Sequence, residues 1–211
     1  MLLAHSTENI RAIRAATSSD PLRVLVSGCI VGMPCGVDGT DNGLGGALRH
    51  ILSLPTVKAI PFCPEHHGMG TPRSTPDIHG GDGYDVLDGR ARVLDEHGVD
   101  LTEKMIIGAR AMLANAQANA VELAILTDMS AACGSQVISD GCRLSSERRY
   151  RVGVGVATAL LVRNGFLVVS QRDHRTLGHI RARLDASFQV DPTATDHHES
   201  PWYRGYFEPP G

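Results

Sequence analysis

The stretch from residue 23 to residue 35, RVLVSGCIVGMPC, decides the fold class. It opens with a β-branched, apolar run, Arg23–Ser27 (RVLVS), and passes through one glycine into Cys29. A short apolar run bounded by turn residues is typical of a strand buried on both faces, and such strands belong mostly to parallel sheets. We therefore expect a buried parallel strand with a cysteine just beyond its carboxyl end.

Three more runs of this kind alternate with helical patterns along the chain. Strands are expected at Arg23–Ser27, Val57–Phe62, Val121–Thr127 and Phe166–Ser170, and helices at Gly46–Leu54, Thr102–Ala118 and Val154–Arg163. This alternation predicts an α/β fold: a three-layer, mostly parallel, doubly wound (Rossmann-like) sheet with right-handed crossovers. A long segment rich in Gly and Pro, residues 68–92, interrupts the pattern and is expected to be an active-site loop, because loops of that length are usually functional.

The chain has 211 residues, which suits one α/β domain with extensions. We expect an N-terminal extension over residues 1–20, a catalytic α/β domain over 21–184 and a C-terminal extension over 185–211. The C-terminal extension is polar and contains the only tryptophan, Trp202. It is expected either to dock on the domain or to mediate association, which would give a homodimer.

Charge and cysteine content narrow the class of protein. A formal net charge of −3 does not suit a nucleic-acid polymer as partner, because phosphate contacts need a basic face. The first twenty residues lack the apolar run of a signal peptide, and no run of about twenty apolar residues suggests a membrane span. Five cysteines, an odd number, favour reduced thiols over a disulfide framework. We expect a soluble cytoplasmic protein that does not bind membranes.

Three cysteines follow three different predicted strands. Cys29 lies two residues after the first strand, Cys63 directly follows the second, and Cys133 lies with Ser130 in the turn after the third. Ligands of open parallel sheets bind beyond the carboxyl ends of the strands, so these thiols are expected to share one site. The alternative is that they are small buried core residues, as free cysteines often are.

Converging thiols would bind zinc or an iron–sulfur cluster. The wide spacing does not resemble the C-x₂₋₄-C pairs of structural zinc sites, so a cluster fits better. Three ligands for four irons leave one iron open to bind and polarise a substrate atom. Cys35 is a candidate fourth ligand or a neighbour of the site, and Cys142 is expected to be a bystander.

Four polar residues near these cysteines are candidates for substrate chemistry. Glu65, two residues after Cys63, could activate water as a general base, or be an ordinary loop or helix-start carboxylate. Ser130 could orient substrate or transfer a proton, or only cap the following helix. Arg73 and Asp82, in the long loop, could bind polar edges of a small substrate, or form an ion pair that braces the loop.

Five motifs, taken in order, resemble a bacterial family long labelled as a domain of unknown function, which includes the short thiouracil desulfidases. The motifs are LVSGCIVGMPCGVDG, PFCPEHHGMGTPR, IHGGDGYDVLDGRARV, SAACGS and GVATALLVRNG. The resemblance runs from about Val24 to Val169, and the ordered set is far more specific than any single motif. The two ends of the chain lie outside it.

The resemblance implies a 4Fe-4S cluster held by the cysteines that match by motif, Cys29, Cys63 and Cys133, with the fourth iron free. Glu65 and Ser130 match the catalytic carboxylate and hydroxyl of that family. The implied activity is a hydrolase or lyase reaction on a C–S bond, in which activated water displaces the thiocarbonyl sulfur as sulfide without net redox change. The implied partner is a small thiolated molecule such as a nucleobase. Open clusters of this kind are commonly lost in air.

The sequence departs from the family pattern in three places. Gly36-Val37 replaces an Arg-Tyr pair, residues 66–70 replace a more apolar stretch, and Ala131-Ala132 replaces Pro-Ser. Loss of the Arg and Tyr removes groups that would hydrogen-bond to and stack on a pyrimidine, so the substrate could be another thioamide-like compound. Two alternatives remain: a non-catalytic iron–sulfur sensor, and a sulfur-transfer protein that forms a persulfide on Cys35.

Overall fold

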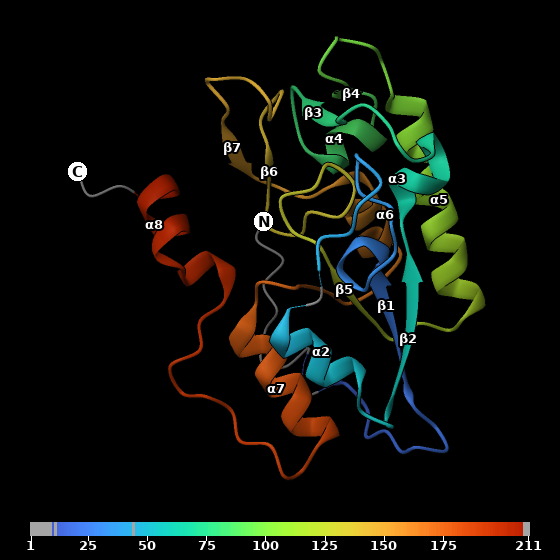
Figure 1. The fold of residues 1–211 in the computed structure, drawn as a ribbon, viewed down its shortest axis with the longest axis vertical. Coiled ribbons are helices and arrows are strands. Elements are labelled where there is room, and N and C mark those ends of the chain that lie inside the picture. Colours follow the sequence, from blue (N-terminus) through green and yellow to red (C-terminus); the bar gives the residue numbers. More distant parts are fainter. Residues whose placement is uncertain (1–9, 11, 44, 209–211) are drawn as a thin grey trace.

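The computed structural model describes residues 10, 12–43 and 45–208. Its centre is a parallel sheet in the order β2-β1-β5-β8, flanked by helices as predicted for a three-layer α/β fold (Figure 1). The strands are β1 (Leu22–Ser27), β2 (Val57–Phe62), β5 (Leu123–Leu126) and β8 (Val168–Ser170). The chain moves from β1 outward to β2 and then crosses back to β5 on the other side of β1. Strand order therefore reverses between β1 and β5, where such sheets bind ligands.

The strand β2 differs from the expected buried strand. It forms one edge of the sheet, and within it only Ile60 is buried. Lys58 and Pro61 suit this position, because a charged side chain and a residue without an N–H both discourage further pairing. An apolar run alone does not distinguish an edge strand from a central one.

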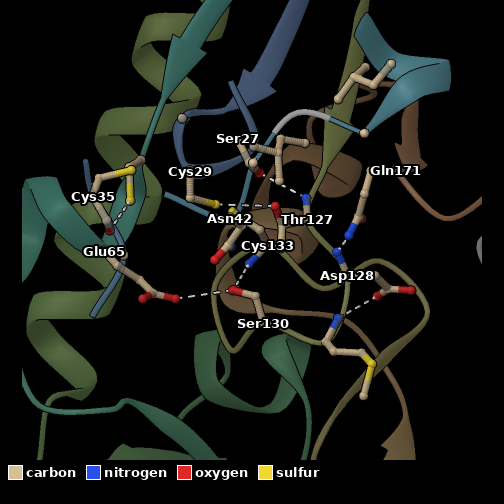
Figure 2. Close-up of a pocket in the computed structure, with 18 of the residues that line it drawn as sticks. Ser27, Cys29, Cys35, Asn42, Glu65, Thr127, Asp128, Ser130, Cys133 and Gln171 are labelled. Carbon is tan, nitrogen blue, oxygen red and sulfur yellow. Dashed lines mark hydrogen bonds between the residues drawn. The ribbon is translucent and has the colours of Figure 1, made fainter. Parts of the chain in front are cut away.

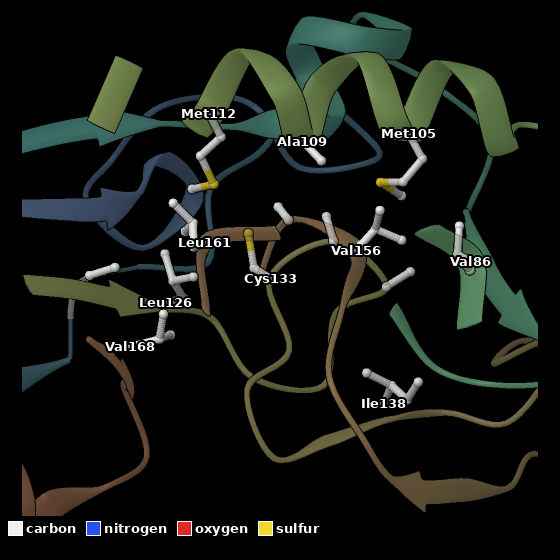
Figure 3. Close-up of a cluster of buried hydrophobic side chains, with 14 of the residues drawn as sticks. Val86, Met105, Ala109, Met112, Leu126, Cys133, Ile138, Val156, Leu161 and Val168 are labelled. Atoms are coloured by element: carbon white, nitrogen blue, oxygen red, sulfur yellow. The ribbon is translucent and has the colours of Figure 1, made fainter. Parts of the chain in front are cut away.

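The side chains of β1 point alternately to the two faces of the sheet, and both faces are covered by helices. Leu25 faces one apolar cluster, and Leu22, Val24 and Val26 face another. The first face is covered by α3 (Pro64–Met69), α5 (Thr102–Ala118) and α6 (Val156–Arg163), and the second by α2 (Gly46–Leu52) and α7 (His174–Leu184). Figure 3 shows Met112 of α5 directed toward Leu161 of α6, and Met105 of α5 directed toward Val156 of α6.

Residues 68–92 are not one irregular loop. They contain β3 (Asp77–His79) and α4 (Gly83–Leu87), and end at β4 (Arg92–Leu94), which pairs with β3 in antiparallel fashion. A second hairpin joins β6 (Val137–Ser139) to β7 (Tyr150–Val152). Three-residue strands are too short for hydrophobic alternation to reveal, which explains why the sequence suggested only a loop.

The C-terminal extension docks on the domain. It contains a 3₁₀ turn, η2 (His197–Glu199), and a short helix, α8 (Pro201–Phe207), beside the β6–β7 hairpin (Figure 1). Half of the predicted N-terminal extension, residues 1–9 and 11, lies outside the described residues, but Ile10 and Ile13 pack on the second apolar cluster. In the described part of the chain, no helix has the length and apolar content needed to cross a bilayer. Homodimer formation stays a prediction.

Candidate active site

A cavity of about 600 Å³ opens at the carboxyl edge of the sheet. Residues directly after β1, β2, β5 and β8 line it, so it lies where strand order reverses. Cavities of this size hold small organic ligands. The cavity walls include Cys29, Cys63 and Cys133, together with Glu65 and Ser130. The three thiols that follow strand ends therefore line one cavity, and Figure 2 shows two of them, Cys29 and Cys133, with Glu65 and Ser130.

Two of the thiols sit at the starts of short helical turns. Cys29 lies in the 3₁₀ turn η1 (Gly28–Ile30), and its Sγ is 3.4 Å from the hydroxyl of Thr127 beyond β5. Cys63 is the N-cap of α3, where its Sγ accepts the N–H of His66 at 3.3 Å and Pro64 occupies the first helical position. Both cysteines are half-buried and line the cavity.

The third thiol lies in the buried turn between β5 and β6. The N–H of Cys133 donates to the Ser130 hydroxyl at 3.1 Å, and its carbonyl accepts from the Thr158 hydroxyl of α6 at 2.9 Å. Gly155 lets α6 begin against this turn, because a Cβ there would lie 2.4 Å from the carbonyl carbon of Ala132. Cys133 belongs to the apolar cluster of Figure 3 and also lines the cavity.

Burial disfavours the charged form of all three thiols. It raises the pKa of Cys29 and of Cys63, and bonds from Thr127 and His66 only partly offset that shift. The pKa of Cys133 is raised well above its ordinary value by burial, with further contributions from the charges of Cys29 and Cys63. A cation bound among the three thiols would favour their thiolate forms.

The other two cysteines differ in their position relative to the cavity. Cys35 is 2% exposed and lines the same cavity, and its carbonyl accepts from the Cys63 thiol at 3.8 Å. Burial, followed by the charge of Cys63, raises the pKa of Cys35 to about 12. Cys142 is not among the residues that line the cavity. In the described residues, no three Cys, His, Asp or Glu side chains are grouped closely enough to hold a single metal ion.

Glu65, Ser130 and Arg73 form one hydrogen-bonded chain. The Ser130 hydroxyl donates to Glu65 Oε1 at 3.2 Å and also accepts the N–H groups of Ala132 and Cys133. Glu65 Oε2 accepts from the Arg73 guanidinium at 2.6 Å, and both side chains are nearly buried. Ser130 therefore caps the turn, one of the two roles considered for it, and also contacts the carboxylate of Glu65. Arg73 braces the loop instead of presenting a free guanidinium.

Arg73 contacts Glu65 through only one of its two terminal nitrogens. Its second terminal nitrogen lies within 3.3 Å of four oxygens in the two neighbouring loops. These are the carbonyls of Cys35, Gly36 and Gly70 and the hydroxyl of Thr71. The loop after β1 is thus tied to the loop after α3.

The structure does not bring Asp82 to the cavity. Asp82 is the N-cap of α4, where its side chain accepts the N–H groups of Tyr84 and Asp85. Sequence reasoning also missed polar groups of the cavity wall. They are Asn42, Arg143, Gln171, Arg172 and His174. The last three directly follow β8, so the strand-end rule applied to the fourth strand would have found them.

These features define a small α/β protein with three thiols and a carboxylate–hydroxyl pair around one ligand-sized cavity. The model of the 2-thiouracil desulfurase family matches residues 24–173. The chain belongs to this family, which confirms the family resemblance seen in its motifs.

Two individual proteins are similar to this chain. An uncharacterized protein of Bacillus subtilis (strain 168), YbbK, is 36% identical over 152 residues, which are 71% of this chain and 96% of YbbK. A solved structure of the 4Fe-4S-dependent thiouracil desulfidase TudS is 31% identical and superposes with a TM-score of 0.60, covering 71% of this chain and 91% of TudS. The TudS structure supports the Rossmann-like fold assigned here.

Proposed function

We propose that this protein removes sulfur from a thiolated nucleobase or a similar small thiocarbonyl compound, with the help of a 4Fe-4S cluster held by Cys29, Cys63 and Cys133. The observation that carries the proposal is the Glu65–Ser130 hydrogen bond inside the thiol-lined cavity. Membership of the 2-thiouracil desulfurase family and similarity to a 4Fe-4S-dependent desulfidase support it.

The three thiols fit an iron–sulfur cluster by their donor chemistry. Thiolate is the usual ligand of such clusters, and ligands that bind separate irons can come from separate loops. Here each thiol follows a different strand and faces one cavity. When bound, the cluster would supply a Lewis-acidic iron for the thiocarbonyl sulfur.

The protein's own groups then account for the rest of the reaction. Glu65 accepts a proton from a water molecule whose oxygen forms a bond to the thiocarbonyl carbon. Ser130, hydrogen-bonded to Glu65, holds that carboxylate in place and can carry a proton to the departing sulfur. The carbon–sulfur bond breaks, sulfur leaves as sulfide, and the product is the carbonyl compound. No oxidant or reductant is consumed.

The two alternative functions fit the site less well. A cluster-based sensor has no need of a carboxylate and a hydroxyl aimed at one another in a ligand-sized cavity. A persulfide carrier needs an accessible, easily ionised thiol, whereas Cys35 is 2% exposed and its thiol pKa is raised by burial.

The test is anaerobic reconstitution of the full chain, followed by iron and acid-labile sulfide assays and chromatography of 2-thiouracil, 4-thiouracil and their products. We expect close to four irons per chain and conversion of a thiolated base to its oxo form with release of sulfide. Cys29→Ser, Cys63→Ser and Cys133→Ser should each lose the cluster, and Cys142→Ser should keep it. A cluster without turnover of any thiolated compound would support the sensor, and no iron uptake would exclude both functions.

A further inference from the structure

The turn that carries Ser130 and Cys133 is closed by one buried carboxylate. Asp128 follows β5, is 3% exposed, and gathers backbone N–H groups from both ends of the turn on its Oδ1. The four donors, at 2.9–3.2 Å, are Met129, Ser135, Gln136 and Val137. These hydrogen bonds to Asp128 therefore fix the conformation of the backbone between β5 and β6. Asp128 lies beside Ser130 in the cavity wall (Figure 2).

The other carboxylate oxygen of Asp128 faces the C-terminal extension. Its Oδ2 lies 2.6 Å from Nδ1 of His197, a residue 69 positions further along the chain. His197 is 4% exposed, and its Nε2 has no hydrogen-bond partner among the described residues. Burial raises the pKa of Asp128, but the hydrogen bond and charge of His197 and the backbone N–H groups outweigh burial, and the pKa is lowered. A buried carboxylate needs such partners.

The backbone of His197 makes a second connection to the same turn. Its N–H donates to Oδ1 of Asp173 at 3.1 Å. Asp173 also accepts from the side-chain amide of Gln136, at 2.6 and 2.7 Å. His197 thus contacts the turn through two buried aspartates, by side chain and by main chain.

Several other contacts fix this part of the extension on the domain. Asp196 accepts the N–H and the hydroxyl of Thr176 at the start of α7. The ring of Trp202 stacks on His197 at 5.6 Å, and the Tyr206 hydroxyl accepts the N–H of Tyr150 in β7. All of these extension residues lie beyond residue 173, where the family match ends.

We propose that His197 is a positioning residue, through which the C-terminal extension holds the Ser130–Cys133 turn in its active form. His197 does not line the cavity, so it acts through Asp128. The expected effect of a His197 substitution on turnover rests on the proposed function. The expected effect on the conformation of the turn does not depend on the proposed function.

The experiment compares amide hydrogen exchange in the full chain without a cluster for wild type, His197→Ala, His197→Asn and His198→Ala. His198 is the exposed neighbour in the same 3₁₀ turn and serves as the matched control. Loss of a hydrogen bond to a charged group should speed exchange at Ser135, Gln136 and Val137 by about tenfold or more in His197→Ala. His197→Asn, whose amide can take the place of Nδ1, should restore part of the protection.

Steady-state kinetics of the reconstituted enzymes give the second readout. In His197→Ala we expect kcat to fall with KM nearly unchanged, because the turn that carries Ser130 and Cys133 moves while the cavity residues after β1, β2 and β8 stay. Equal exchange in His197→Ala and wild type would overturn the proposal, as would faster exchange spread evenly over α5 and the sheet. If His197→Ala does not fold, Asp128→Asn tests the same contact. Faster exchange confined to the turn in a chain that desulfurates nothing would refute the proposed function alone.

Discussion

Both carboxylate oxygens of Glu65 are engaged, one by Arg73 and the other by Ser130. This arrangement fixes the carboxylate without covering it, since Glu65 still lines the cavity. Glu65→Gln keeps the size of the side chain and removes the proton acceptor. We expect turnover to fall by about 10²–10⁴, the range of general-base effects, at unchanged iron content. Glu147→Gln, an exposed carboxylate, is the control, and full activity in Glu65→Gln would refute the assignment.

Arg73 shows why an arginine is needed at this position. One terminal nitrogen contacts Glu65 while the other reaches carbonyls of two loops, including that of Cys35. An ammonium is a point charge and cannot span both sets. In urea titrations of the cluster-free chain, Arg73→Lys should lower the free energy of unfolding by about 1–3 kcal/mol. Arg148→Lys, on the surface, should change nothing measurable, and an equal effect of the two substitutions would show that Arg73 does not brace the loops.

At the scale of elements, the start of α6 packs against the Cys133 turn with no room for a side chain. In Gly155→Ala the new Cβ would lie 2.4 Å from the backbone of Ala132, so either the helix or the turn must move. We expect a loss of about 1–3 kcal/mol or more and a lower Tm in thermal unfolding. Gly205→Ala in α8 meets no atom within 4 Å and should be neutral or slightly stabilising. A Tm unchanged by Gly155→Ala would contradict this packing.

The arrangement of the helices and strands also explains which parts of the fold and the site could be predicted from the sequence. The central strands β1 and β5 were predictable because burial on both faces requires apolar runs. That Cys29, Cys63 and Cys133 line one cavity was predictable because each follows a different strand of the sheet. The contact between Asp128 and His197 was not, since it depends on how residues 185–196, after α7, return the chain to the carboxyl edge of the sheet. Asp82 suited a binding loop by composition, but its spacing from Asp85 forms a capping box on α4.

At the scale of the whole molecule, arginine–carboxylate pairs join parts that are distant in sequence. They connect the N-terminal segment to the sheet, α4 to α6, and α7 to the C-terminal extension. The pairs are Arg14–Glu122, Arg163–Asp88 and Arg175–Glu199. The hydrogen bond from Arg163 lowers the pKa of Asp88. The pKa of Glu199 is lowered first by the hydrogen bond from the N–H of Asp196 and then by Arg175. Burial raises the pKa of Glu122, but Arg14 and Arg23 outweigh it and the pKa is lowered.

These lowered pKa values set the sign of the pH dependence. Because the folded-state pKa lies below the unfolded value of about 3.9 for Asp or 4.3 for Glu, the stabilisation is present above those values and is lost as pH falls through the folded pKa. In urea titrations of the cluster-free chain, we expect the free energy of unfolding to be nearly level from about pH 7 to pH 5 and to fall steeply below about pH 4. Glu122→Gln should be less stable than wild type near neutrality and approach it as the pH falls through the lowered folded-state pKa of Glu122, the pH at which wild-type Glu122 is itself protonated. A gap between the two proteins that stays constant down to that pH would show that the ion pairs of Glu122 do not stabilise the fold.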